Sequence, residues 1–254
     1  MRTSEANQKN GRAMRLSGFQ ALSFDCYGTL IDWETGISAV LKPWVRDHNL
    51  EIKNERLLAA YAHHETRIEA QTPTAPYPDV VAQSMMAIGH DLGVPVNRAD
   101  ADRLATSVPD WPAFPDSREA LASLAEHYDL IVLSNVDRVS FQGSNQRLGV
   151  SFTEIITAED VGSYKPSVRN FEVLLTRAAQ RGIDSDKLLH VAQSLFHDHI
   201  PAKAAGLATV WINRRHGRPG WGATPPPTTS VTPDWEFTSM RAFAEACSED
   251  RAVH

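Results

Sequence analysis

The stretch ALSFDCYGTL, residues 21–30, constrains this chain more than any other, because an apolar run leads directly into a carboxylate and a glycine turn. Short apolar runs of this kind are typical of buried strands in parallel sheets. Asp25 then stands at the carboxyl end of the strand, where open α/β sheets hold their ligands. A carboxylate there is costly unless it is paired or takes part in chemistry. We therefore expect Asp25 to mark a functional site.

The composition limits the classes of partner and location. The chain has 254 residues, a formal net charge of −6, and Cys26 and Cys247 as its cysteines. The negative charge argues against nucleic acid or an anionic membrane as the main partner, since both reward clustered Lys and Arg. The distant cysteines indicate neither a disulfide framework nor a metal site and favour a reducing, cytoplasmic location. No apolar run approaches the ~18 residues of a membrane span. Residues 1–16 lack the apolar middle of a signal peptide and are predicted to be a disordered leader.

Helical spacing dominates the region after the first strand. Apolar residues recur at helical intervals in 32–49, 57–70 and 80–92, before the next convincing strand at 130–133. An insertion of this length exceeds an ordinary βα connection, which takes about 2–6 residues. We predict a helical cap domain over residues 33–112, inserted into an α/β core domain formed by residues 17–32 and 113–254. The apolar faces of the cap helices could be buried within the chain or in a homodimer, and the sequence leaves both open.

From residue 117 the pattern changes to a regular alternation of helices and strands. Strands are predicted at 129–133, 154–157, 188–192 and 208–212, and helices at 119–127, 140–148, 167–181 and 199–205. Residues 235–246 are predicted to form a final strand or helix. Such alternation implies right-handed crossovers between parallel strands. The predicted fold class is therefore α/β, a doubly wound parallel sheet (a Rossmann-like core) with an inserted helical cap domain.

Polar side chains follow three later strands at the edge where Asp25 is expected. They are Ser134 and Asn135 after the second strand, Lys165 after the third, and Ser194, His197 and Asp198 after the fourth. Because the carboxyl ends of parallel strands share one edge, we expect these side chains to lie together. Lys165 is placed to pair with Asp25 and keep it ionised at neutral pH. This convergence favours catalysis over a turn or a helix cap as the role of Asp25.

The order of these motifs resembles the haloacid dehalogenase superfamily, and more narrowly the type II (S)-2-haloacid dehalogenases. The resemblance rests on the segments FDCYGTL (24–30), SN (134–135), YKP (164–166) and SLFHD (194–198), and it extends over residues 19–243. Phosphatases and mutases of the superfamily carry a second aspartate at the position of Tyr27, and that aspartate protonates the leaving group. Halide leaves as a stable anion and needs no proton. Tyr27 therefore indicates attack on carbon rather than on phosphorus.

The resemblance implies covalent catalysis by a carboxylate. Asp25 attacks C2 of a small-molecule 2-haloacid substrate and expels halide, and water then cleaves the ester with Asp198 as the orienting base. Lys165 orients Asp25, while Ser134 helps to hold the substrate carboxylate or the ester oxyanion. The substrate-binding residues that the resemblance implies are Tyr27, Thr29, Asn135, Ser194, Arg67 and Phe171. It implies no metal and no cofactor.

The chain departs from the family pattern around the expected halide site. The dehalogenases use a cap arginine near the halide and a tyrosine where this chain has Phe171. Arg67 or His64 could take over the anion contact, although Arg67 by itself is typical of a surface helix charge and Phe171 of packing. Two rival functions stay open: a Mg²⁺-dependent small-molecule phosphatase of the same superfamily, and a catalytically idle binding module. Two carboxylates and a buried lysine disfavour the second, because an idle pocket has no physical need of them.

Overall fold

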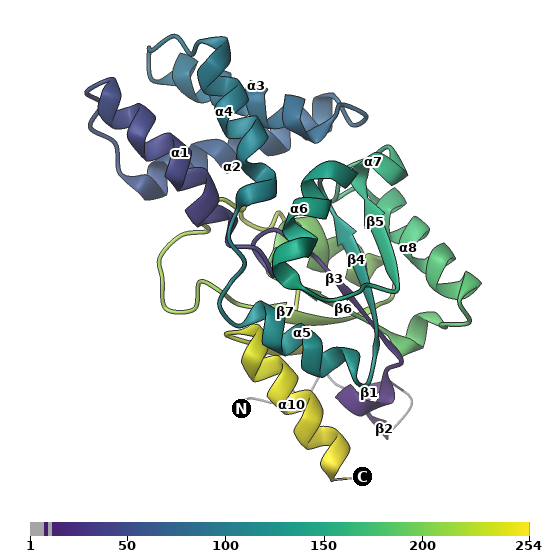
Figure 1. Ribbon diagram of the computed structural model, residues 1–254. Coiled ribbons are helices and arrows are strands. Elements are labelled where there is room, and N and C mark those ends of the chain that lie inside the picture. Colours follow the sequence, from purple (N-terminus) through teal and green to yellow (C-terminus); the bar gives the residue numbers. More distant parts are fainter. Residues whose placement is uncertain (1–7, 10–11, 254) are drawn as a thin grey trace.

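The computed structural model describes residues 8–9 and 12–253 and shows a parallel sheet with a group of helices standing at one end of it (Figure 1). The sheet has the strand order β5-β4-β3-β6-β7-β8, and its neighbouring strands run parallel. The strands are β3 (Ala21–Phe24), β4 (Asp129–Ser134), β5 (Glu154–Thr157), β6 (Leu188–Ala192), β7 (Ala208–Ile212) and β8 (Trp235–Phe237). This architecture confirms the predicted α/β fold class.

Strand β3 lies inside the sheet, with Phe24 opposite Val132 of β4 on one side and Val191 of β6 on the other. The chain runs outward from β3 through β4 to β5, and then crosses back to build β6, β7 and β8 on the other side. The carboxyl end of β3 is therefore the point where the strand order reverses. Doubly wound sheets hold their ligands at this point, and Asp25 directly follows β3 there.

Helices cover both faces of the sheet. Successive residues of β3 point to opposite faces, so each face has apolar side chains that the helices bury. The core helices are α5 (Ser117–Ala125), α6 (Arg138–Leu148), α7 (Ala158–Val161), α8 (Val168–Gln180), α9 (Ile200–Ala204) and α10 (Met240–Ala252). Phe24 belongs to the larger apolar cluster together with Phe141 of α6. Ala21 belongs to a second cluster together with Phe171 of α8. The predicted strand or helix at 235–246 divides into β8 and most of α10.

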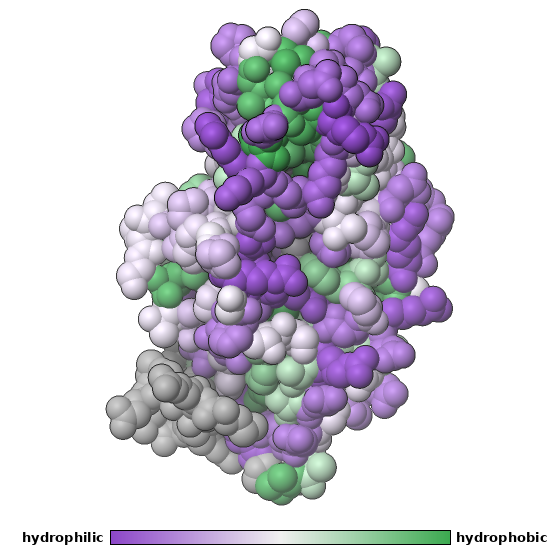
Figure 2. Space-filling view, turned by 90° about the vertical axis from the view of Figure 1, so that its left-hand side faces the viewer, coloured by the Kyte–Doolittle hydropathy of each residue, from purple (hydrophilic) through white to green (hydrophobic). Residues whose placement is uncertain are grey.

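The helices of the cap pack on one another. They are α1 (Trp33–Asp47), α2 (Asn54–Gln71), α3 (Tyr77–Asp91) and α4 (Arg98–Ser107), with α3 in contact with both α2 and α4. Leu41, Tyr61, Val80 and Leu104 are fully buried between them. Helix α4 was not predicted, because its sequence RADADRLATS has too few apolar residues to show a helical stripe. The apolar faces thus meet within the chain, while the homodimer stays a prediction. Figure 2 shows further hydrophobic residues grouped at the cap end, with hydrophilic residues around them.

The two connections between core and cap lie side by side. Ile31 forms an antiparallel bridge with Ala113, and the Asp32 amide donates to the Pro112 carbonyl at 2.7 Å. The Asp32 carboxylate also caps α1 by accepting from the Thr35 amide at 3.1 Å. These contacts support residues 33–112 as the proposed extent of the cap, because helix α1 begins where the paired connections end.

The predicted disordered leader, residues 1–16, falls largely outside the described residues. Within the described part, Gln8–Lys9 pairs antiparallel with Arg12–Ala13, and Leu16 is buried in the core. Over the described ranges, the structure contains no helix with both the length and the apolar character of a membrane span.

Candidate active site

Asp25 is held on both carboxylate oxygens at the end of β3. Its Oδ1 accepts from Lys165 Nζ at 2.9 Å, and its Oδ2 accepts from the Thr29 hydroxyl at 2.6 Å. The Gln193 amide donates to Thr29 Oγ1 at 2.9 Å, which leaves the Thr29 proton directed at Asp25. Gly28 adopts φ +93° in the intervening turn, a conformation that side chains disfavour. The carboxylate is only 6% exposed.

Lys165 joins the two aspartates of the site. Its Nζ donates to Asp25 Oδ1 at 2.9 Å, to Asp198 Oδ1 at 2.6 Å and to the Leu133 carbonyl at 3.0 Å, which uses all three of its protons. Burial alone would lower the pKa of Lys165, but the charges of Asp198 and Asp25 outweigh it and raise the pKa. The ammonium therefore stays charged although its side chain is 1% exposed.

The Asn135 side chain fixes the position of Lys165 by bonding to the Lys165 backbone. Asn135 Oδ1 accepts from the Lys165 amide at 2.7 Å, and Asn135 Nδ2 donates to the Lys165 carbonyl at 3.0 Å. Two residues after separate strands are thereby joined as a reciprocal pair. This contact explains why the side chain that follows β4 fixes the position of the lysine loop after β5.

Asp198 lies in a π-helical turn, Leu195–His199, that directly precedes α9. The helix predicted from residue 199 thus follows a segment whose wider turn carries the aspartate, and such turns are frequent at functional sites. Ser194 caps the turn by accepting from the His197 amide at 2.9 Å. His190 Nε2 donates to Asp198 Oδ1 at 3.1 Å, and His190 Nδ1 lies 2.9 Å from Ser23 Oγ.

The two aspartates differ in their electrostatic environment. Burial raises the pKa of Asp25, with Lys165 opposing that rise and Asp198 adding to it. Burial also opposes ionisation of Asp198, but Lys165 and His190 outweigh it and lower the pKa of Asp198. Asp198 is therefore the carboxylate that stays ionised most firmly. Among the described residues, its Oδ2 has no hydrogen-bond partner, so one oxygen is free to accept a proton from water or substrate.

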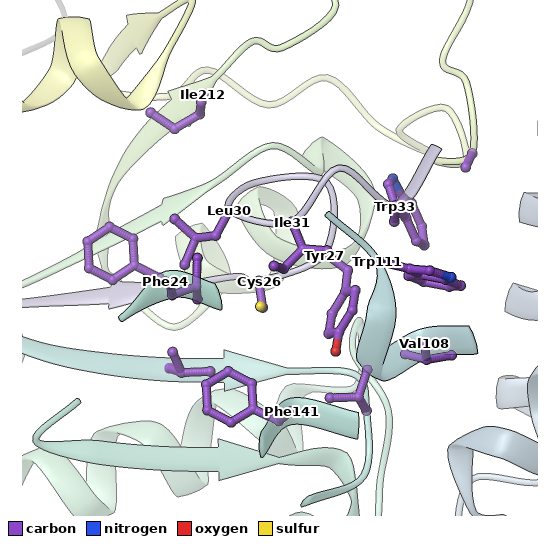
Figure 3. Packing of buried hydrophobic residues seen from close by; sticks show 14 of the residues in the cluster. Phe24, Cys26, Tyr27, Leu30, Ile31, Trp33, Val108, Trp111, Phe141 and Ile212 are labelled. Atoms are coloured by element: carbon purple, nitrogen blue, oxygen red, sulfur yellow. The ribbon is translucent and has the colours of Figure 1, made fainter. Parts of the chain in front are cut away.

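Tyr27 lines the cavity at Asp25, whereas Ser134 ends the neighbouring strand β4 and does not line that cavity. The Tyr27 hydroxyl is 2.7 Å from Ser144 Oγ and points away from the site toward the helix of Phe141, while its ring packs edge-on against Trp111 (Figure 3). Ser134 Oγ is buried and has no partner within the described part of the chain. Tyr27 thus contributes a ring to the site, and Ser134 contributes a hydroxyl that can still donate.

Arg67 and Phe171 do not reach the site. Arg67 is exposed, and its guanidinium lies 3.4 Å from His64 Nδ1. Phe171 is fully buried on the other side of His190, with ring centroids 5.2 Å apart. Neither lines the cavity at Asp25. The helical period explains Arg67, because α2 turns the stripe of Glu65 and Glu69 toward the core and leaves Arg67 to the side.

The cavity at Asp25 has a volume of about 30 Å³ and lies between the core and the cap. It is lined by Asp25, Tyr27, Trp33, Glu65, Glu69, Tyr77, Asn135, Val136, Lys165, Ser194, His197, Asp198 and Thr224. The cap residues Glu65, Glu69 and Tyr77 were not predicted. The spacing of Tyr61, Glu65 and Glu69, four residues apart along α2, could have placed them on one stripe of the helix. Within residues 8–9 and 12–253, no cluster of three or more His, Cys, Asp or Glu side chains is placed to hold a metal ion.

A parallel α/β core, an acidic site at its strand ends and a helical cap define a capped enzyme of the Rossmann-like class. Residues 22–212 match the family described as haloacid dehalogenase-like hydrolase. The chain therefore belongs to the haloacid dehalogenase-like hydrolases, which confirms the resemblance drawn from its motifs.

Individual relatives agree with this family. The (S)-2-haloacid dehalogenase of Pseudomonas sp. (strain YL) is 26% identical over 89% of this chain and 93% of its own length. The (S)-2-haloacid dehalogenase of Pseudomonas putida is 24% identical over 80% of this chain and 88% of its own length. A crystal structure of a defluorinating L-2-haloacid dehalogenase is similar with a TM-score of 0.72 and 22% identity, covering 94% of this chain and 96% of that one. The protein is thus a hydrolase, and these three relatives are named as 2-haloacid dehalogenases.

Proposed function

We propose that this protein is a hydrolytic dehalogenase. It converts a small 2-haloacid, or a 2-halo compound of the same shape, to the 2-hydroxy product through an ester at Asp25. The main support for this proposal is the environment of Asp25. Lys165 and Thr29 hold its two carboxylate oxygens. The neighbouring Tyr27 hydroxyl is hydrogen-bonded to Ser144 and points away from Asp25. No acid at the position of Tyr27 can protonate a leaving group, and halide needs none. The (S)-2-haloacid dehalogenases named above support the same chemistry.

The first step of the proposed reaction is displacement at carbon. An oxygen of Asp25 attacks C2 from the face opposite the halogen, the carbon–halogen bond breaks, and halide leaves with the electron pair. Lys165 and Thr29 keep the carboxylate oriented through the 2.9 and 2.6 Å contacts. The unpartnered Ser134 hydroxyl is the donor for the polar head of the substrate.

The second step is hydrolysis of the ester. Water attacks the Asp25 carbonyl carbon, and Asp198 Oδ2 accepts its proton, since the other Asp198 oxygen is occupied by Lys165 and His190. Lys165 stabilises the negative charge that develops on the Asp25 oxygen. The bond between the Asp25 carbonyl carbon and the ester oxygen breaks, and the leaving alkoxide takes up a proton to give the 2-hydroxy product. The regenerated Asp25 carboxylate keeps one oxygen from water.

Substrate entry requires the cap to move. The cavity of about 30 Å³ holds roughly one water molecule, whereas an open groove of about 590 Å³ adjoins it along Gly28, Trp33 and Gln193. The paired connections at Ile31 and Ala113 are the place where the cap joins the core. Opening there admits substrate, and closing excludes bulk water until the ester has formed.

Halide release tests this function. Wild type and Asp25→Asn are assayed on chloro-, bromo- and fluoroacetate and on both enantiomers of 2-chloropropionate, and we expect release that Asp25→Asn abolishes. In a single turnover in H₂¹⁸O, label should enter Asp25. Release that survives Asp25→Asn, or label that never enters Asp25, contradicts the ester mechanism.

The rival functions give different results in the same assays. A Mg²⁺-dependent phosphatase would release phosphate from p-nitrophenyl phosphate only with Mg²⁺, and a binding module would turn over neither substrate class. We also propose that the protein forms a homodimer and is cytoplasmic. Light scattering on the purified protein tests the dimer, and fractionation of cells tests the location.

A further inference from the structure

The cap face opposite Asp25 is acidic. Helix α2 presents Glu65 and Glu69, which are 3% and 4% exposed, into the cavity that also contains Asp25 and Asp198. The cap thus brings two further carboxylates to the site.

Both glutamates are built into the structure. Glu65 Oε1 accepts from the Tyr77 hydroxyl at 2.7 Å and from the Tyr61 hydroxyl at 3.1 Å. Glu69 accepts from Asn135 Nδ2 at 3.3 Å and thereby joins the cap to the core loop that holds Lys165. Burial raises the pKa of Glu65 to about 7, and burial together with the Glu65 charge raises the pKa of Glu69 well above its ordinary value.

The charges around the cavity do not suit a second anion. Of the described residues that line it, Lys165 is the cation, and its three protons already serve Asp25, Asp198 and a carbonyl. His197 also lines the cavity, but burial lowers its pKa to about 4 and leaves it neutral at pH 7. The pKa values of Glu65 and Glu69 are raised because burial and neighbouring carboxylates disfavour negative charge in this cavity. A carboxylate head would meet the same cost with no free cation among these residues.

An unpartnered polar atom in the same wall indicates that the cavity receives a polar group. His197 is 7% exposed, and its Nε2 has no hydrogen-bond partner among the described residues. A neutral imidazole nitrogen accepts or donates one hydrogen bond. Together with the carboxyl oxygens of Glu65 and Glu69, it provides acceptors for N–H groups.

We propose that Glu65 and Glu69 make the cavity selective for an uncharged, N–H-donating head, so that its preferred substrate is a small 2-halocarboxamide rather than the matching 2-haloacid anion. This proposal rests on the dehalogenation at Asp25 proposed above. The reaction balances in the same way: the Asp25 oxygen–C2 bond forms, halide leaves, and one water yields the 2-hydroxyamide and a proton. The amide carbonyl also keeps C2 activated for displacement.

Chloroacetamide and chloroacetate test the selection, because they have nearly the same shape and differ in charge. We expect kcat/KM of wild type to be at least ~10-fold higher for chloroacetamide, the size of one hydrogen bond to a charged group. Glu69→Gln and Glu65→Gln keep the side-chain shape and remove the acidic group, so each should shift the ratio toward chloroacetate by ~10-fold or more. Glu172→Gln is the matched control, because Glu172 is exposed on α8, and it should leave the ratio unchanged.

Binding of unreactive analogues separates this proposal from the function on which it rests. Titration of wild type with propionamide and propionate, followed by NMR, should show tighter binding of propionamide, and Glu69→Gln should reduce that preference. Thermal unfolding of each variant verifies that it is folded. Halide release from neither chloro compound would refute the dehalogenase function. Release with a preference for chloroacetate, tighter binding of propionate, or ratios that both glutamine variants leave unchanged would overturn the selectivity proposal.

Discussion

Replacing Lys165 with methionine removes the cation that joins Asp25 and Asp198 while keeping an apolar stem of similar length. The lysine is 1% exposed and donates to both carboxylates, at 2.9 and 2.6 Å. Removing one partner of a buried ion pair leaves uncompensated charge and costs about 3–5 kcal/mol. We expect the free energy of unfolding of Lys165→Met at pH 7.5 to fall by that amount.

The loss should depend on pH, and the sign follows from the two aspartates. In the wild type, Lys165 helps to lower the pKa of Asp198, so the stability from this carboxylate is present above the ordinary aspartate pKa and is lost as pH falls. In the variant, burial without the cation raises the pKa of both aspartates. The variant then gains stability as pH falls through these raised pKa values, and its deficit should shrink between pH 7.5 and pH 5.

Urea unfolding at the two pH values measures this deficit. Lys203→Met is the control, because Lys203 is 28% exposed and pairs with Asp234 near the surface, where an ion pair contributes at most ~1 kcal/mol. Adding Asp198→Asn to Lys165→Met should recover part of the stability, since it removes one unpaired charge. A loss below ~1 kcal/mol for Lys165→Met, or an equal loss at both pH values, would refute this account of the buried triad.

Three further substitutions test the packing and the cap. In Gly36→Ala, the added Cβ would lie 2.2 Å from the Trp111 ring, so thermal unfolding should show a loss of about 1–3 kcal/mol; Gly18→Ala, with open space around it, is the control, and equal losses would contradict the prediction. Tyr27→Phe leaves Ser144 Oγ without its 2.7 Å partner and should cost about 1 kcal/mol in urea unfolding; an unchanged midpoint would argue against that bond. For Glu65, whose pKa is raised by burial to about 7, stability is lost as pH rises from 5 to 8, by about 2–3 kcal/mol; Glu65→Gln should flatten this dependence, and an unchanged slope would show that Glu65 does not cause it.

Local patterns in the sequence were enough to predict most of the strands and helices of the core. The strands at 154–157, 188–192 and 208–212 agree with β5, β6 and β7, because buried parallel strands appear as short apolar runs between turns. Helix α4 was missed, since its polar surface hides the few apolar residues that it buries. The position of Asp25 at the carboxyl edge of the sheet was predicted from the sequence, because parallel strands bring their carboxyl ends to one edge. That this edge position is also the switch point came from the strand order in the structure.

The cap residues that line the site were not predicted from such patterns. Arg67 and Glu69 are two residues apart on α2, yet one is exposed and the other lines the cavity. Which stripe of a helix faces the catalytic edge depends on the rotation of that helix, and this rotation is set by its packing on α1, α3 and the core. A sequence motif contains no information on this rotation.

The sequence by itself determined the α/β core, the helical insertion, and the placement of Asp25, Lys165 and Asp198 at one sheet edge, because short-range hydrophobic periods and strand order carry that information. Only the tertiary structure showed that Lys165 donates all three of its protons within the site. It also showed that Glu65 and Glu69 line the cavity and that Arg67 does not. Those facts depend on how the cap is turned onto the core. The charge that meets a substrate is therefore a property of that packing.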